Sequence, residues 1–433
     1  MHDVGHSAFN GLATAITPAS TLSRKHIFRP TRVTGQPAPG FVATPVVVNH
    51  VIYVGSNSGD FSAIDLRTGT VLWSKFLGFA AKATCGNARG FAATAAVGTD
   101  PVSGVATVYA PSADGYVYAL QASDGTELWK HAVNVQTPGI NDYFSWSSPE
   151  LANGKIYVGI SSECDNPLVR GGLVALDQAT GDQVAVYYTV PSGSVGGSIW
   201  TSPAIAADGS ILVTTGNGAQ GSLVGETQSI VRLDPDTLQR IDSYQVTRTT
   251  GDSDFGGSPT VFTATLQDVP TPMVGACNKD GNYYAWKLND LSAGPVWHVK
   301  IAPASGQPDA LICVSGAIWD GSNLYVAGTR TTINSVAYRG SIRKLDPATG
   351  AEVWATGLPA AVMTSPSLDG SGAITAASFD YAVTTNSAFL VDAATGAYAV
   401  VDDGGRAAAS PIFADGLLVI ANSKGHIYTY APL

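Results

Sequence analysis

The feature that most constrains this chain is a short unit that recurs along nearly its whole length. The first copy is AIDLRTGTVLW (63–73), in which an apolar pair ends at Asp65, a Thr-Gly turn follows, and Trp73 closes the unit. Asp and Thr side chains stabilise tight turns, and Gly adopts a positive φ without a steric penalty. The unit therefore predicts a β-hairpin anchored by one large aromatic side chain.

Further copies of this hairpin follow at a regular spacing. The position of the turn aspartate, or of its substitute, falls at Asp65, Gln121, Asp177, Asp234, about Lys287, Asp346 and Asp392. The spacing is roughly 46 to 59 residues, at the long end of the period of about 40 to 50 that is typical of propeller blades. The repeat therefore predicts a β-propeller with insertions in its loops.

Eight pairs of strand-like segments precede or follow these hairpins, from TPVVVNHVIYVGS at Thr44 to SPIFADGLLVIANS at Ser410. The eighth pair ends at the C-terminus with HIYTYAPL and lacks an outer strand, which residues 23–34 (SRKHIFRPTRVT) can supply. Closing the ring in this way removes unpaired strand edges. We therefore predict an all-β, eight-bladed propeller over residues 1–433, with residues 1–22 as an N-terminal extension.

Composition agrees with one repetitive domain and excludes several functions. A length of 433 residues alone would suggest two or three domains, but a continuous repeat shares one architecture. The net charge of -10, without a Lys/Arg cluster, makes nucleic acid an improbable partner. No apolar run reaches the ~18 residues of a membrane span.

Four cysteines stand far apart in the chain, and none belongs to a CxxC or CxxCH motif: Cys85, Cys164, Cys277 and Cys313. A covalently attached haem and a zinc ribbon are therefore both disfavoured. Four cysteines allow three disulfide pairings, and buried free thiols are an equally open interpretation.

Six loops outside the repeat carry side chains that a hairpin does not need. These are Arg89 in CGNARG, Glu163 in SSEC, Trp200 in GGSIW, Asn217 in TTGNG, Asp252 and Asp254 in GDSDFGG, and Lys279 in NKDG. Each has an ordinary interpretation as a solvated charge, a turn residue or a core aromatic. Together, however, Glu, Asn and Asp at the ends of strands in consecutive blades are the hard oxygen ligands that suit Ca²⁺. Arg and Lys would bind anions, and Trp200 would stack on a planar ligand.

These motifs resemble those of the alcohol dehydrogenases that depend on pyrroloquinoline quinone (PQQ), which are eight-bladed quinoproteins. The hairpin AxDxxTGxxxW is similar to their tryptophan-docking motif, which a bacterial outer-membrane assembly lipoprotein shares. The six loops also resemble loops of that family, and they follow one another along the chain in the family's order. The resemblance implies PQQ and Ca²⁺ as cofactors. It implies Glu163, Asn217 and Asp254 as calcium ligands, and Glu163, Arg89, Trp200 and Lys279 as residues that bind the quinone. It also implies catalytic roles for Asp254, as the base, and Lys279, with Asp252 as the second candidate for the base.

The implied reaction is oxidation of a small or polymeric alcohol, with hydride transfer to the quinone and proton transfer to the aspartate. An external cytochrome c would take the electrons, and the protein would be periplasmic or extracellular. The loops most resemble the branch of polyvinyl-alcohol-dehydrogenase-like proteins. Two departures from the family stand out: the Arg89 loop has one cysteine instead of an adjacent pair, and Gly256 stands where lanthanide-using relatives carry an acid. The alternatives are a non-catalytic scaffold or binding protein, and a propeller whose channel has another use.

Overall fold

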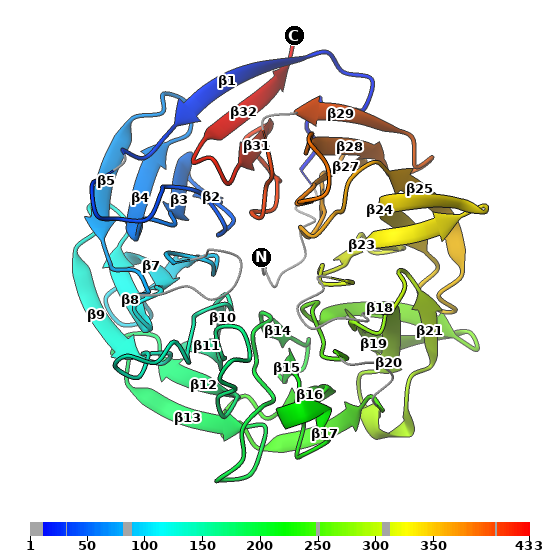
Figure 1. The fold of residues 1–433 in the computed structure, drawn as a ribbon, viewed down its shortest axis with the longest axis horizontal. Helices are drawn as coiled ribbons and strands as arrows, with labels where there is room; N and C mark the ends of the chain where they lie inside the picture. Colours follow the sequence, from blue (N-terminus) through cyan, green and yellow to red (C-terminus); the bar gives the residue numbers. More distant parts are fainter. Residues whose placement is uncertain (1–11, 32, 81–88, 248–251, 305–311, 403–404) are drawn as a thin grey trace.

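The computed structural model describes residues 12–31, 33–80, 89–247, 252–304, 312–402 and 405–433. They form eight four-stranded antiparallel sheets arranged as blades around a ring (Figure 1). This confirms the predicted all-β, eight-bladed propeller. We number the blades in chain order from the first complete sheet, so the strand that begins the chain belongs to blade 8.

Each of the first four blades consists of four consecutive strands, and the first strand of each lies at the inner edge of the blade and the fourth at the outer edge. Blade 1 comprises β2 (Val46–Val48), β3 (Val51–Gly55), β4 (Asp60–Asp65) and β5 (Val71–Phe76); blade 2 comprises β6 (Ala96–Thr99), β7 (Ala106–Pro111), β8 (Tyr116–Gln121) and β9 (Glu127–Ala132). Blade 3 comprises β10 (Glu150–Ala152), β11 (Lys155–Ile160), β12 (Gly172–Asp177) and β13 (Gln183–Tyr188); blade 4 comprises β14 (Ala204–Ile205), β15 (Ile211–Thr214), β16 (Ser229–Leu233) and β17 (Arg240–Gln245).

The remaining blades repeat this order until the ring closes. Blade 5 comprises β18 (Thr260–Leu266), β19 (Val269–Cys277), β20 (Asn282–Lys287) and β21 (Trp297–Lys300); blade 6 comprises β22 (Ile318–Trp319), β23 (Leu324–Ile333), β24 (Val336–Leu345) and β25 (Glu352–Leu358). Blade 7 comprises β26 (Ser367–Leu368), β27 (Ala373–Ala377), β28 (Ala388–Asp392) and β29 (Tyr398–Asp402); blade 8 comprises β30 (Ile412–Ala414), β31 (Leu417–Ala421), β32 (Ile427–Pro432) and β1 (Leu22–Phe28). Two 3₁₀ turns, η1 (Ala219–Gly221) and η2 (Leu291–Ala293), complete the elements, and the described residues contain no helix able to cross a membrane.

The ring is closed by the N-terminal strand, as predicted. Strand β1 pairs antiparallel with β32 from Leu22 opposite Pro432 to Phe28 opposite Ile427. The strand ends earlier than the predicted segment 23–34, because Pro30 has no N–H to donate to a ladder. Upstream of β1, the N-H of Thr14 donates to Oδ2 of Asp369 in blade 7 at 3.0 Å, and Ile16 is buried.

The hydrophobic core is divided among the blade interfaces. Alternating side chains of one strand point to opposite faces of the sheet, so each blade has two faces to bury. In β4, Phe61 and Ala63 join a cluster shared with blade 2, whereas Ile64 joins one shared with blade 8. Among the described residues every one of the eight interfaces has such a cluster. No blade therefore has a core of its own.

Hydroxyl groups join neighbouring blades where the inner strands begin. A Ser or Thr stands just before most inner strands, and its hydroxyl oxygen accepts a backbone N–H from the same place in the previous blade. The bonds run from Thr44 N to Thr94 Oγ1 (3.3 Å), Thr94 N to Ser148 Oγ (3.0 Å), Ser148 N to Ser202 Oγ (3.2 Å), Ser202 N to Ser258 Oγ (3.0 Å), Gly316 N to Ser365 Oγ (2.9 Å) and Ser410 N to Thr44 Oγ1 (3.0 Å). These bonds set the spacing of the blades around the axis.

The hairpin repeat also joins neighbouring blades, at the outer edge of the ring. In blade 6, Oδ1 of Asp346 accepts hydrogen bonds from the N–H and hydroxyl of Thr349 at 2.9 and 2.7 Å, and Gly350 follows with φ +70°. The indole of Trp297, from blade 5, covers this glycine so closely that an added Cβ would lie 2.4 Å from Cε3. Its N–H donates to the carbonyl of Pro347 at 3.0 Å. The same stacking joins Trp73 to Gly125, Trp129 to Gly181 and Trp354 to Gly396.

The up-and-down order of the strands decides which loops share a face. In each blade the turn between the second and third strands lies at the same end as the connection from the outer strand to the next blade. Turns such as Asp346–Gly350, between the third and outer strands, lie at the other end. Every loop that carries a predicted site residue lies at the first of these two ends, because it is either a turn between the second and third strands or a connection to the next blade. We call the end that holds these loops the site face.

We predict that a side chain at Gly350 breaks the stacking between blades 5 and 6. Gly350→Ala should lose about 1–2 kcal/mol for the left-handed backbone and a further 1–3 kcal/mol for the collision with Trp297. Gly154 is the matched control, since its φ is +71° and no atom lies within 4 Å of an added Cβ. Gly154→Ala should lose only the backbone contribution, as measured by urea unfolding. Equal losses in the two variants would show that the stacking contributes nothing.

A second prediction concerns Asp380, which joins blades 6 and 7 on the site face. Arg339 donates from Nε and Nη2 to its two oxygens at 2.6 and 2.8 Å, and this lowers the pKa of Asp380 to about 2. A lowered pKa stabilises the fold above the ordinary value near 3.8 and loses the effect as pH falls toward 2. Asp380→Asn should therefore cost about 1 kcal/mol at pH 7, with a discount for the 40% exposure of Arg339. The difference from wild type should shrink below pH 4, and a constant difference would contradict the ion pair.

Candidate functional site

The predicted site residues come from successive loops of the site face. Glu163, Asn217 and Lys279 lie in the turns between the second and third strands of blades 3, 4 and 5. Trp200 and Asp254 lie in the connections that leave blades 3 and 4. Loops from three neighbouring blades therefore alternate along one arc of the ring.

The centre of the cluster is the ammonium of Lys279. Its Nζ lies 2.9 Å from Oδ1 of Asp254 and 3.2 Å from Oδ2 of Asp252. All three side chains are less than 10% exposed. A buried ammonium is stable only when it is paired, and here two carboxylates share it. The structure thus brings both aspartates of the GDSDFGG loop to the same lysine.

Trp200 and Asn217 complete the contacts around this lysine. The indole N–H of Trp200 donates to Oδ2 of Asp254 at 3.1 Å, and Nζ of Lys279 lies 4.9 Å from the centre of the indole ring. The amide Nδ2 of Asn217 donates to Oδ1 of Asp252 at 2.9 Å. Four of the predicted site residues, with Asp252, therefore form one connected network.

The two aspartates have different electrostatic environments. Burial raises the pKa of Asp254 well above its ordinary value, and the nearby charge of Asp252 adds to this although Lys279 opposes it. Burial would also raise the pKa of Asp252, but the charge of Lys279 and the hydrogen bonds around the carboxylate outweigh it, so that pKa is lowered. The two carboxylates hold the pKa of Lys279 above its ordinary value despite burial. Asp252 is thus the more acidic group and Asp254 the more basic.

Glu163 is buried, at 3% exposure, in the turn between β11 and β12. Its N–H donates to the carbonyl of Asp142, and its own carbonyl accepts the indole N–H of Trp146 at 3.0 Å. The preceding residue, Ser162, lies in hydrogen-bond range of Ser198 Oγ, in the loop that carries Trp200. The backbone around Glu163 is therefore held rigidly against the Trp200 loop.

Asp165 and Gln228 are site residues that the sequence analysis missed. The hydroxyl of Ser162 donates to Oδ1 of Asp165 at 2.5 Å, and the carboxyl of Asp165 interacts with Lys279, Asp252 and Asn217. Desolvation by the surrounding protein raises its pKa. Nε2 of Gln228 donates to Oδ1 of Asn217 at 3.2 Å. Asp165 stands two residues after Glu163 in SSECD, which was a usable signal, whereas no sequence pattern distinguished Gln228.

Arg89 lies on the same face in the connection that leaves blade 1, two blade junctions before Trp200 and three before Asp254. Its backbone N–H donates to Oδ1 of Asn57 at 2.6 Å, its Nε donates to the carbonyl of Ala80 at 3.1 Å, and its guanidinium lies 5.2 Å from the ring of Phe79. Asn57 lies in the turn between β3 and β4 of blade 1, and Phe79 and Ala80 lie in the connection that leaves this blade. Between Arg89 and Trp200 lies an apolar cluster that includes Phe144 and Trp146.

The described cysteines are oxidised, so the interpretation as free thiols was wrong for them. Cys277 and Cys313 form a disulfide, and Cys164 is also disulfide-bonded. Cys85 lies outside the described residues.

The side chains of the network offer donors for a cation. Within the part of the chain that the structure describes, no group of three or more His, Cys, Asp and Glu side chains is arranged to hold a metal ion. The predicted set mixes carboxylates with the amide of Asn217, which such a group does not include. Its donors are all hard oxygen atoms, and the three carboxylates of Asp165, Asp252 and Asp254 all interact with the single ammonium of Lys279. The donor chemistry and the excess of negative charge therefore fit a hard divalent cation such as Ca²⁺.

Comparison with known proteins finds matches to two protein families. Residues 21–312 match the PQQ family, described as the β-propeller domain of glucose, ethanol and alcohol dehydrogenases, and residues 338–432 match the family of the outer membrane protein assembly factor BamB. The chain is 28% identical over 255 residues to a quinohemoprotein alcohol dehydrogenase of Comamonas testosteroni, covering 48% of this chain and 33% of that protein. It is 26% identical over 357 residues to a polyvinylalcohol dehydrogenase of a Pseudomonas species, covering 72% and 52%.

The fold likeness extends over nearly the whole chain. The solved structure of the quinohemoprotein alcohol dehydrogenase ADHIIG of Pseudomonas putida superimposes with a TM-score of 0.75 at 16% identity, covering 97% of this chain and 78% of that one. At such an identity the likeness concerns the fold alone. The matched regions cover about half or less of the two curated relatives described above. Because the family match spans well over half of the sequence, the chain belongs to the PQQ family, the β-propeller domain of glucose, ethanol and alcohol dehydrogenases.

Proposed function

We propose that this protein oxidises an alcohol with PQQ as the electron acceptor and Ca²⁺ as a structural and electrostatic partner of the site. The observation that carries the proposal is the network in which Lys279 joins Asp252 and Asp254 while Trp200 donates to Asp254. A scaffold would have no use for three buried charges in one place, because burying them costs free energy. A redox site needs such charges to bind and activate its reactants.

The cation would be held by oxygen atoms of Glu163, Asn217 and Asp254, with Asp165 close enough to contribute charge. Trp200 would support the flat face of the cofactor, Arg89 and Lys279 would bind its anionic groups, and Glu163 would serve cation and cofactor together. When bound, PQQ supplies the acceptor for the hydride that leaves the alcohol carbon, and Ca²⁺ supplies a Lewis acid.

Asp254 is the proposed general base. A base is most effective when its pKa lies near the working pH, and burial raises the pKa of Asp254 whereas that of Asp252 is lowered. Asp254 takes the hydroxyl proton of the alcohol, oriented by the indole N–H of Trp200. Lys279 stabilises negative charge that develops on oxygen during the reaction. Asp252 orients Lys279 and Asn217, from which it accepts hydrogen bonds.

The relatives and the cysteines support a proposal for the substrate and the location. Two of the relatives are named for alcohol oxidation, one of them for a polymeric alcohol. We propose a small or polymeric alcohol as the substrate and an external cytochrome c as the acceptor of the electrons. The disulfide-bonded state of Cys164, Cys277 and Cys313 supports an oxidising compartment, either the periplasm or the exterior of the cell.

A second candidate function is a scaffold or binding protein, including a propeller with another use for its channel. It is favoured by the match of residues 338–432 to the BamB family. That region runs from β24 of blade 6 through blade 7 to β32 of blade 8, and it carries none of the proposed site residues. Addition of PQQ and CaCl₂ followed by a dye-reduction screen over alcohols separates the two functions, because a scaffold would show neither cofactor absorbance nor turnover.

We predict that Asp254→Asn retains the cofactor but lowers turnover by about 10²–10⁴-fold, the usual effect of losing a general base. Asp252→Asn serves as the comparison, since it removes a carboxylate that also contacts Lys279, at 3.2 Å against 2.9 Å for Asp254, but not the proposed base. It should weaken loading of the cofactor more than turnover per loaded site. If Asp252→Asn loses turnover and Asp254→Asn does not, the roles of the two residues are reversed.

We also predict that Glu163→Ala lowers the calcium and PQQ contents together, by about tenfold or more at a fixed low concentration of each, because hard cations depend strongly on carboxylate ligands. Metal content and PQQ absorbance after reconstitution provide the measurement. Glu127→Ala, on the exposed outer strand of blade 2, is the control and should load like wild type. Normal loading of Glu163→Ala would remove this residue from the site.

A further inference from the structure

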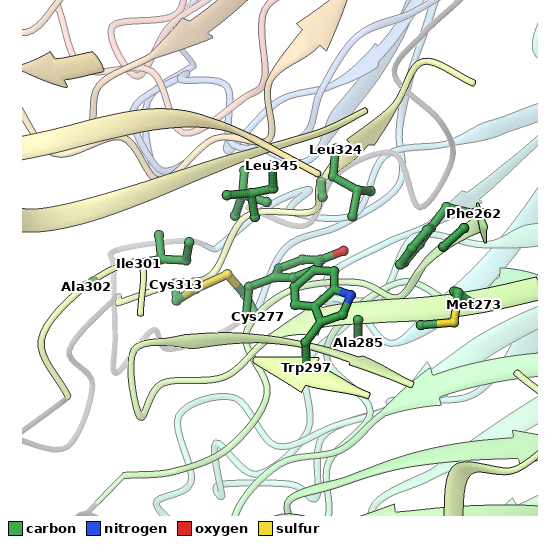
Figure 2. Close-up of a cluster of buried hydrophobic side chains, with 14 of the residues drawn as sticks. Phe262, Met273, Cys277, Ala285, Trp297, Ile301, Ala302, Cys313, Leu324 and Leu345 are labelled. Atoms are coloured by element: carbon green, nitrogen blue, oxygen red, sulfur yellow. A yellow bond between two sulfur atoms is a disulfide. The ribbon is translucent and has the colours of Figure 1, made fainter. Parts of the chain in front are cut away.

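The Cys277–Cys313 disulfide lies directly behind the loop that carries Asp252 and Asp254. Cys277 is the last residue of β19, Cys313 belongs to the connection from blade 5 to blade 6, and both are fully buried. The bond sits in the core between these blades, beside Ile301 and Trp297 (Figure 2). It joins residues 36 positions apart.

On one side of the disulfide, Cys277 holds the aspartate loop through its backbone. The N–H groups of Gly256 and Gly257 both approach the carbonyl of Cys277, at 3.2 and 3.3 Å. A Cβ added to Gly257 would lie 3.0 Å from Cβ of Cys277. The loop that presents Asp254 is therefore packed against Cys277 without room for a side chain.

On the other side, the residues that follow Cys313 cover the same two glycines. A Cβ added to Gly256 would lie 2.5 Å from Cγ1 of Val314, and one added to Gly257 would lie 2.7 Å from the carbonyl oxygen of Ser315. Residues 256–257 are thus enclosed between 277 and 314–315. The disulfide links these two outer layers covalently.

Lys279 is part of the same layered arrangement, because it lies two residues after Cys277 and contacts the aspartate loop. The N–H of Lys279 donates to the carbonyl of Asp254 at 2.9 Å, and Nδ2 of Asn278 donates to the carbonyl of Ser253 at 2.7 Å. A lysine side chain has a flexible four-carbon stem, so its ammonium keeps one position only if the surrounding framework is rigid.

We propose that the Cys277–Cys313 disulfide positions Lys279 against Asp252 and Asp254, as a clamp that encloses the aspartate loop. Its value for catalysis rests on the proposed function, but the positioning itself does not. The two cysteines are positioning residues, since neither touches the carboxylates or the ammonium in the contacts described above. Loss of the bond should loosen the lysine while the propeller stays folded.

The test measures the reactivity of individual lysines in the purified, folded chain. Trace labelling with acetic anhydride, read by peptide mass spectrometry, should modify Lys279 slowly in wild type because its side chain is only 8% exposed. In Cys277→Ala/Cys313→Ala the rate should rise by about tenfold, equivalent to about 1.4 kcal/mol of easier opening. Exposed Lys287, in β20 of the same blade, is the internal reference and should not change.

Met273→Ala is the matched control for general destabilisation. Met273 is fully buried in β19 and belongs to the same core cluster, but it lies four residues before Cys277. This variant should lose stability without faster labelling of Lys279. Equal acceleration in both variants, or none in the cysteine variant, would overturn the proposal.

A second measurement avoids any risk that the double variant fails to fold. Wild type is titrated with tris(2-carboxyethyl)phosphine in mild urea, where the phosphine is oxidised and the disulfide takes up two electrons and two protons to give two thiols. Labelling of Lys279 should rise in step with the reduced fraction of Cys277–Cys313, and unchanged labelling at full reduction would overturn the proposal. Neither measurement uses PQQ, so an inactive protein whose Lys279 responds would refute the proposed function and leave this inference standing.

Discussion

Contacts between neighbouring blades are the constraint on which this structure depends. A four-stranded sheet has two apolar faces, and here each face is buried only against the next sheet. Backbone N–H groups at the starts of inner strands donate to hydroxyl groups of the neighbouring blade, such as Ser202 N to Ser258 Oγ. At the outer edge, indole rings such as Trp297 cover the turn glycine of the next blade. Because every blade needs both neighbours, the ring must close, and β1 closes it.

The same contacts explain why the site can be precise. Ser202 lies two residues after Trp200 and Ser258 lies four residues after Asp254, so one hydrogen bond between blades also constrains the separation of the two site loops. The loops are not part of the hairpin repeat, so they can carry charged side chains. Burying Lys279 with its two aspartates costs free energy. The rigid framework around these side chains prevents the movement that would remove this cost.

Much of the fold could be predicted from sequence because its signals are local and repeated. The Asp-Thr-Gly turn, the aromatic position and the eight strand pairs each needed only neighbouring residues to be recognised. The end of the closing strand at Phe28 was less accessible, since it depends on pairing with β32 at the other end of the chain. The grouping of Trp200, Asn217, Asp254 and Lys279 was predicted through resemblance, and the structure brings these four side chains into one network.

Sequence by itself determined the repeat, the number of blades and the loops in which unusual side chains stand, because these are properties of the order of residues. Only the tertiary structure decided which of those side chains meet. It united both aspartates on Lys279, added Asp165 and Gln228, and brought Cys277 to Cys313 behind the loop. The physical reason is that a propeller brings residues from different blades together around one axis, and the partners, distances and burial that set their charges arise only when the ring has closed.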